Sequence, residues 1–565
     1  GFRGIAETQR RRNDDQGEQK VGGRVHNLWL HSSSLDGVLM ADKGIAYLEW
    51  TFEYKNASTL LAEVRKEIQL PPNAVISRVT LWVNGVEREA VITTKSKATN
   101  AYRAIVKRKR DPILVTLIGK ERALIQMYPV PAGGIMKARI GITIPLKFKN
   151  EKTAFFTFPK INARNFSVRQ KFSHSLWLET KLKEGMYFHA KGMTDSKNSK
   201  PLWTSKLITS IPHTVFRSDE LYVGMKRENI SNDSYAALTP NIEKALSLSG
   251  VVKQTISATK NTYHNIVVVL DGSLSSKKHR HTLIRVIQQI PDNVTMEFIL
   301  SGDKARIIHP MGELDSRAKK LLISTLQSIQ FEGGKDNIIG LQTAMKRSLA
   351  VSTDTSRTAV VWIHGPQPHL LSSMNQINQY TKRNPKKITL FYVPTEAGSN
   401  KIIRAMPSIP SHYLVNNFGL QQGLSNLLSQ LSGQKKTYQR KYSIVPASTI
   451  SPRTLKSSSH LLRLWAKQKI DRLLNTSRSG SNQALIKQAN LISKTMHLVT
   501  AVSGALVLET DKEYKQHGID KQKLTPGMVP GVPEPGTWLL FIITGMMFSF
   551  MVLLQRKRNR ESLAG

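Results

Sequence analysis

The chain has 565 residues with a hydrophobic content of 40%, which is enough for about three domains that each bury their own core. Lys and Arg number 82 against 40 Asp and Glu, and the resulting net charge of +42 favours anionic partners such as lipid headgroups, acidic exopolysaccharide or extracellular DNA. The basic residues are scattered and form no aromatic-interleaved nucleic-acid module, so no specific nucleic-acid recognition is expected. The absence of cysteine excludes disulfides, thiol nucleophiles and thiolate metal sites.

The first segment, residues 1–24, is polar and contains the run Arg10 to Arg12. It has no apolar stretch of the kind that a secretory signal requires. Because the C-terminal segment indicates export, we expect either that an upstream signal was removed or that the sequence is a fragment.

Residues 25–150 show short strand-like runs that alternate with turn signals. The runs 46–54 and 77–83 are typical strands, and Asn84-Gly85 directly after the second is a strong hairpin signal. The pattern predicts an all-β sandwich.

Several residues of this module resemble the VIT domain, the vault and inter-alpha-trypsin module. They are Phe52, Tyr54, Asn56, the run 70–75, the run 83–85, Ala101-Tyr102, the run 110–112 and the run 128–130. In that family the domain is a scaffold, so the resemblance implies no chemistry here. Residues 151–260 continue in β-rich style and are expected to form a connector.

Residues 261–433 alternate strands and helices. The continuous apolar run 265–270 predicts a strand covered on both faces, and further strands are expected at 296–300, 358–363 and 388–393 with helices between them. This alternation predicts a doubly wound parallel sheet with its site at the carboxyl ends of the strands.

A chain of oxygen-bearing residues follows the first of these strands: Asp271, Ser273 and Ser275. The Asp-x-Ser-x-Ser pattern resembles the metal-ion-dependent adhesion site of von Willebrand factor A (VWA) domains. The resemblance implies Mg²⁺ held by hard oxygen ligands, with a carboxylate from a partner protein completing the shell.

Two further ligands of that family are replaced in this sequence. Lys335 stands where a threonine is expected, and His364 stands where an aspartate is expected. An ammonium group could satisfy Asp271 and both serines in place of the ion, so we interpret the site as degenerate and expect no cofactor. Asp336 keeps Mg²⁺ open as the alternative, because a small shift of its loop would bring in a second carboxylate.

Residues 434–523 are expected to form helices, near 461–474 and 484–494, followed by a strand-like run. Leu464-Trp465-Ala466 and the run 498–509 are similar to the segment that follows the A domain in VIT-containing proteins, where it packs back onto the core. Residues 524–531 contain Pro526 and Pro530 and indicate a linker.

The last segment, 532–565, indicates membrane attachment. Residues 538–554 carry no charge and are just long enough for a transmembrane helix, and the basic residues after them predict a cytoplasmic C-terminus. The segment resembles the PEP-CTERM sorting signal of Gram-negative bacteria, which an exosortase processes. The matching residues are Val532, Pro533, Glu534, Pro535, Trp538, Arg556, Lys557 and Arg558. A rigid spacer before a plain anchor is the alternative.

Together these features predict a multidomain α+β protein with a β-sandwich, a doubly wound α/β domain and a single C-terminal span. We expect an inner-membrane protein with its domains outside the cytoplasm, handled by an exosortase and released to the cell surface if the tail is cleaved. Its expected partners are the membrane and a surface protein or acidic polysaccharide.

No catalytic pattern rises above chance, so no enzyme is expected. The alternatives are an accessory of the sorting machinery or a hydrolase of unrecognised class.

Overall fold

The computed structural model describes residues 21–519 apart from short internal gaps. These gaps are 109, 111, 120, 184, 191–202, 219–220, 228–232, 261–262, 333–335, 352–356, 384–386, 397, 399, 407–410, 414–418, 451–457 and 479–481. The sorting signal, the predicted span 538–554 and Lys335 therefore lie outside the described residues. Within the described residues, no helix combines the length and the apolar character needed to cross a bilayer.

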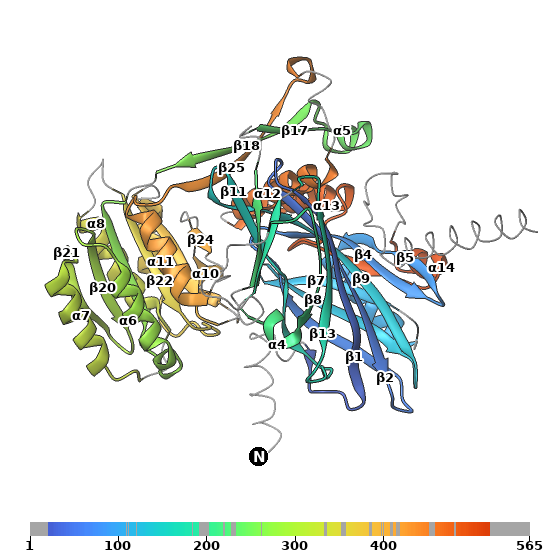
Figure 1. The fold of residues 1–565 in the computed structure, drawn as a ribbon, viewed down its shortest axis with the longest axis horizontal. Coiled ribbons are helices and arrows are strands. Elements are labelled where there is room, and N and C mark those ends of the chain that lie inside the picture. Colours follow the sequence, from blue (N-terminus) through green and yellow to red (C-terminus); the bar gives the residue numbers. More distant parts are fainter. Residues whose placement is uncertain are drawn as a thin grey trace, which may run out of the picture.

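The N-terminal half forms a β-sandwich, as the strand pattern predicted (Figure 1). One sheet has the order β15-β13-β1-β2-β9-β4-β5, with bounds Lys206–Pro212, Ser173–Thr180, Leu28–Met40, Ile45–Asn56, Ile135–Pro145, Val75–Val83 and Val86–Glu89. The other has the order β12-β3-β8-β7-β26-β6, with bounds Lys160–Arg164, Ala62–Gln69, Arg122–Val130, Ile113–Gly119, Ser503–Val507 and Val91–Thr94.

Alternation along β2 builds the centre of this sandwich. Trp50, Phe52 and Tyr54 are two residues apart, so they share a face, and all three are fully buried. They join one apolar cluster with side chains of the opposite sheet, including Val64 and Ile68 of β3. The predicted hairpin is also confirmed, because Asn84 and Gly85 both have positive φ, at 52° and 79°.

The segment expected as a connector, 151–260, supplies strands to several sheets. β13 pairs with β1, and β12 pairs with β3. A further sheet has the order β10-β11-β16-β14, with bounds Lys147–Asn150, Thr153–Thr157, Leu221–Lys226 and Met186–Ala190. The strands of this segment are thus integral parts of the β-rich body.

The C-terminal segment completes the same body. β26 lies between β7 and β6 in the second sheet, about 390 residues downstream of β7 along the chain. Helices α12 (Ser459–Arg478) and α13 (Gln483–Thr495) pack together, and α12 lies against β4 and β9 of the first sheet. This segment therefore packs onto the β-rich body.

A small sheet links the two halves of the molecule. Its order is β17-β18-β25, with bounds Asp233–Ala237, Val251–Thr259 and Thr437–Val445. The α/β domain occupies the chain between β18 and β25, and the antiparallel pair closes at Thr259 opposite Thr437. The α/β domain is therefore an insertion into a β-rich body formed by the residues before and after it.

The inserted domain is the predicted doubly wound sheet. The strand order is β21-β20-β19-β22-β23-β24, with bounds Ala305–Glu313, Thr295–Ser301, Asn265–Asp271, Thr358–His364, Ile388–Pro394 and Ser411–Tyr413. The pairs from β20 to β24 are parallel, and β21 is antiparallel to β20.

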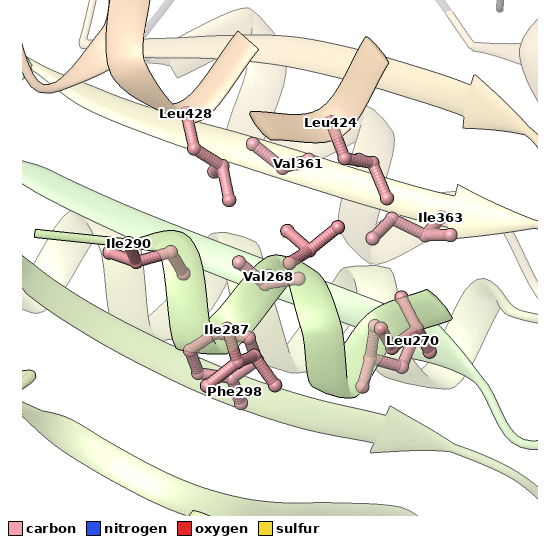
Figure 2. A pocket seen from close by; sticks show the side chains of 11 residues that line it. Val268, Leu270, Ile287, Ile290, Phe298, Val361, Ile363, Leu424 and Leu428 are labelled. Carbon is pink, nitrogen blue, oxygen red and sulfur yellow. The ribbon is translucent and has the colours of Figure 1, made fainter. Parts of the chain in front are cut away.

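Helices cover both faces of this sheet, which explains the continuous apolar run of β19. One face is covered by α6 (Arg280–Gln289), α7 (Ser316–Ser328) and α11 (Gly419–Leu431), and it receives Ile266, Val268 and Leu270 of β19. The other face is covered by α8 (Ile338–Val351), α9 (Asn375–Arg383) and α10 (Lys401–Ala405), and it receives Val267 and Val269. Figure 2 shows the first face, where side chains of α6 and α11 meet the sheet around a small void. Only apolar side chains line that void, so it belongs to the core and is no candidate for a polar ligand.

A buried lysine lies inside the sandwich. Lys66 on β3 has 0% of its surface exposed, its amine lies among the rings of Trp50, Phe52 and Tyr54, and it has no hydrogen-bond partner in the described part of the chain. Burial lowers the pKa of the Lys66 amine well below its ordinary value. The folded protein therefore holds this amine without the solvation that it has in the unfolded chain.

Replacing this amine with an apolar side chain of similar volume should stabilise the protein. We expect Lys66→Met to raise the free energy of unfolding in urea by about 1–3 kcal/mol, because the cost of an unsatisfied buried donor disappears. The unfolding free energy of the wild type should also increase as the pH rises from neutral toward the ordinary lysine pKa, because the unfolded chain binds a proton at Lys66 that the folded chain lacks. In Lys66→Met, this contribution to the pH dependence of the unfolding free energy should be absent. The exposed Lys149→Met serves as the control, and a destabilised Lys66→Met would contradict this account.

Candidate functional site at the end of the central strands

The site lies where β19 and β22 end side by side. Asp271 is the last residue of β19, and its side chain is buried at 5% exposure. The chain then turns over the neighbouring strand, where the amide of Gly272 donates to the carbonyl of Ser301 at 2.8 Å. This turn places Asp271 at the carboxyl edge of the sheet, as the strand order predicts.

Donors from three segments close around the Asp271 carboxylate. Oδ1 accepts hydrogen bonds from the amide of Ser273 at 3.0 Å and from Nδ2 of Asn337 at 3.3 Å. Oδ2 accepts from the amide of Gly365 at 3.1 Å. Hydrogen bonds of this kind stabilise an ionised carboxylate.

The predicted serines lie on the outer side of this carboxylate. The hydroxyl of Ser273 lies 2.9 Å from that of Ser275 and 3.4 Å from that of Ser276. Ser275 is exposed and Ser276 is buried. Leu274 stands between the two predicted serines with 65% of its surface exposed. The loop and the start of the short 3-10 helix η1 (Leu274–His279) that follows it therefore present an apolar side chain flanked by hydroxyls at the surface.

Asp336 holds a different loop. It is 4% exposed, and its Oδ1 accepts from the amide of Ile338 at 3.4 Å. Its Oδ2 accepts from the amides of Ser372, at 2.8 Å, and Leu371. The hydrogen-bonding capacity of this carboxylate is directed at backbone amides, so Asp336 positions the segment before α9.

His364 is a buried neutral imidazole. Its Nδ1 lies 2.6 Å from the carbonyl of Gly365 and must donate to it, and its Nε2 accepts from Nδ2 of Asn400 at 3.4 Å. The ring stacks on Trp362 with centroids 3.9 Å apart. Burial lowers the pKa of His364 to about 4, although the Gly365 carbonyl and Asp271 oppose the shift. Both ring nitrogens thus have hydrogen-bond partners within the protein.

Asn337 connects the site residues, although it was not among the candidates predicted from the sequence. Its Nδ2 contacts Asp271, its Oδ1 accepts from Nε1 of Trp362 at 3.0 Å, and its amide donates to Oε1 of Gln367 at 3.0 Å. An asparagine at the start of a helix that faces the strand ends could have been noticed from the sequence. Gln367 lies beyond β22 in an irregular segment, and its role depends on folding.

The described side chains offer a divalent ion few ligands. One carboxylate and two serine hydroxyls face the site, and three hydrogen-bond donors already contact the Asp271 oxygens, so most of the shell of a hard cation would have to come from water. Across the described ranges, no three His, Asp or Glu side chains gather as a metal-binding group. Lys335, the predicted substitute cation, lies outside the described residues.

Comparison with known proteins agrees with the architecture. Residues 40–144 match the family described as the vault protein inter-alpha-trypsin (VIT) domain. None of the curated proteins matches the chain.

Solved structures that resemble the chain include VWA proteins. A von Willebrand factor type A protein from Catenulispora acidiphila is 10% identical with a TM-score of 0.27, and the match covers 35% of this chain and 49% of that one. Manganese-loaded TRAP protein of Plasmodium vivax is 12% identical with a TM-score of 0.24, covering 34% and 81%. The SpRpn10 VWA domain is 14% identical with a TM-score of 0.22, covering 31% and 98%. This chain thus spans about half of the first of these proteins, and similarity this low does not extend to ligands or partners.

Proposed function

We propose that this chain is a non-enzymatic binding protein in which a VIT-type scaffold carries a VWA-like domain that contacts a partner protein. The observation that carries the proposal is Leu274, which is 65% exposed on a loop that Asp271 holds in place. An exposed apolar side chain flanked by hydroxyls on a rigid loop is suited to a protein interface, because little order must be gained on binding.

The proposal can be tested by site-specific crosslinking in living cells. A photo-reactive amino acid at position 274 should crosslink to a discrete partner protein, and Asp271→Asn should reduce that product because the loop loses its anchor. The matched control is position 321, a leucine of α7 with a similar exposure of 66%. Equal crosslinking at both positions, or no effect of Asp271→Asn, would refute a binding role for the loop.

We also propose that the adhesion-type site is occupied by Lys335 in place of a metal ion. The replacement of two expected ligands, Lys335 and His364, supports this, as does the enclosure of Asp271 by hydrogen-bond donors. An ammonium beside Asp271 would repel a divalent cation, whereas it could neutralise the carboxylate at a smaller dehydration cost.

Removing the substitute cation should therefore destabilise the α/β domain without metal and make the domain sensitive to Mg²⁺. We expect Lys335→Ala to lower the unfolding free energy by about 1–3 kcal/mol, since Asp271 would lose its counter-charge. Calorimetry on the wild-type chain should show no stoichiometric Mg²⁺ or Mn²⁺ binding. Lys346→Ala on the exposed side of α8 is the matched control, and tight metal binding by the wild type would exclude this proposal.

We further propose that the protein is exported, that it is anchored in the inner membrane by residues 538–554, and that an exosortase recognises Val532 to Pro535. The order of the Pro-Glu-Pro stretch, apolar run and basic stub supports this, and the net charge of +42 supports contact with acidic polysaccharide as a second mode of binding. A protein that keeps its tail would instead act as an accessory of the sorting system.

Intact-mass analysis separates these two roles. In a host with its exosortase, the mass should correspond to a C-terminus near residues 533–535, and in a host without the enzyme it should extend to Gly565. A tail that remains in both hosts would show a permanent anchor and would favour the accessory role.

A further inference from the structure

A groove lies at the outer edge of the sheet that links the two halves of the molecule. The order β17-β18-β25 leaves β25 with a strand neighbour on one side only in the described part of the chain. Helix α12 lies close to this sheet and contacts β17 and β18 (Figure 1). Between β25 and α12 is a groove of about 320 Å³.

The groove follows the backbone of β25. Its walls include Tyr442, Ser443 and Ile444, which are consecutive along the strand. Tyr442 and Ile444 are two residues apart, so they share a face, and both pack in the cluster that contains Trp465 of α12. The groove thus lies between α12 and β25, the outermost strand of this sheet in the described part of the chain. On their other side these residues pair with Gln254, Lys253 and Val252 of β18. The groove therefore borders the edge at which a further strand could add.

The opposite wall is positively charged. Lys469 and Arg472 are three residues apart on α12 and thus share a face. The Lys469 amine lies 5.5 Å from the centroid of the Trp465 ring, and the Arg472 guanidinium donates to Oε1 of Gln468 at 2.8 Å.

Neither cation is neutralised by its surroundings. In the described residues no carboxylate pairs with Lys469 or Arg472, and the neighbouring Asp471 is paired with Lys467 at 2.8 Å. Burial lowers the pKa of Lys469, as expected for an amine partly withdrawn from water without a counter-ion. The groove thus combines a strand edge, two aromatic side chains and two cations that have no acidic partner among the described residues.

We propose that this groove binds an extended acidic segment of a partner protein, which adds to β25 as a strand and directs its carboxylates to Lys469 and Arg472. Backbone pairing would supply affinity, and the two cations would select acidic residues at alternate positions. A peptide fits better than a polysaccharide because the strand edge repeats its donors and acceptors at the spacing of a peptide backbone. The groove is separate from the Asp271 loop, since no residue of that loop lines it.

Fluorescence anisotropy with the full-length chain in detergent tests this proposal. The probe is a labelled peptide of four Glu-Val repeats, which places all carboxylates on one face of a strand. Replacing both cations in Lys469→Gln/Arg472→Gln should weaken binding at least about tenfold, because two charge-assisted hydrogen bonds are lost. The matched control Lys487→Gln/Lys494→Gln removes the same charge from α13 and should leave binding unchanged. Equal weakening in both double variants would mean that net charge alone attracts the peptide, and would overturn the proposal.

Backbone methylation of the probe tests strand addition directly. Two versions of the peptide carry N-methyl groups on alternate residues, one on the glutamates and one on the valines. Only one of these sets of amides can face β25, so one version should lose binding while the other keeps it. Equal affinities for both versions would refute strand pairing. If acidic oligogalacturonate binds with the same sensitivity to the Lys469/Arg472 variant while the peptide does not bind, the groove is a polysaccharide site and the proposal fails.

Because the Asp271 loop takes no part in this assay, its result is independent of the crosslinking at position 274. A failure of the groove proposal would leave the proposed partner contact of the α/β domain in place, and the reverse also holds.

Discussion

The architecture depends on the insertion of β26 between β7 and β6. Without this strand, both neighbours would expose an unpaired backbone edge inside a sandwich, which costs free energy for every unsatisfied amide and carbonyl. The same segment covers helix α3 (Lys95–Lys107), because Leu506 of β26 and Leu508, just after the strand, pack with Ala101 and Tyr102. The N-terminal module therefore requires residues that come after the α/β domain, and the chain must leave the β-rich body and return to it.

Buried polar groups help to fix α12 against the first sheet. Helix α12 brings His460 to the first sheet, where its ring lies 4.4 Å from that of Tyr47 and its Nδ1 lies 3.0 Å from Oγ1 of Thr143. Beneath it, Arg78 donates to Glu49 at 2.6 Å. Burial of Arg463 on the same helix lowers the pKa of its guanidinium to about 10. The hydrogen bond between His460 and Thr143 favours one docking position for the helix, since a shift of the helix would break it.

Local patterns were sufficient to predict much of the fold. The run 265–270 indicated a strand covered on both faces, and the apolar periodicity near 461–474 indicated a helix, because both signals depend on neighbours along the chain. The pairing of β26 with β6 and β7 could not be read in this way, since a sheet partner hundreds of residues away leaves no mark on the local pattern. The same holds for Lys66, whose environment arises only when β3 faces β2.

At the candidate site, too, local patterns predicted the position, whereas the contacts depend on tertiary packing. Its position at the end of β19 followed from the strand pattern and the Asp-x-Ser-x-Ser motif. Its chemistry depended on side chains brought together from separate loops: Asn337 contacts Asp271, and Asp336 contacts the amides of residues 371 and 372. A motif identifies residues by their spacing in the sequence, whereas tertiary packing decides their hydrogen-bond partners. For this reason Asp336 was a candidate metal ligand in the sequence, and in the structure it holds a neighbouring loop.

The antiparallel connection of β18 and β25 has a mechanical consequence. Both strands enter the α/β domain from the same end, at Thr259 and Thr437, so a force that pulls this domain away from the β-rich body draws both strands in one direction. A force that acts on both strands in the same direction does not break the backbone hydrogen bonds between β18 and β25, because neither strand is displaced relative to the other. The load passes instead to the packing of this ribbon on α12 and to the side-chain hydrogen bonds of Arg440 with the carbonyls of Gly44 and Leu146. A ligand held by the inserted domain would therefore pull on this single ribbon, which can act as the tension-bearing link of the molecule.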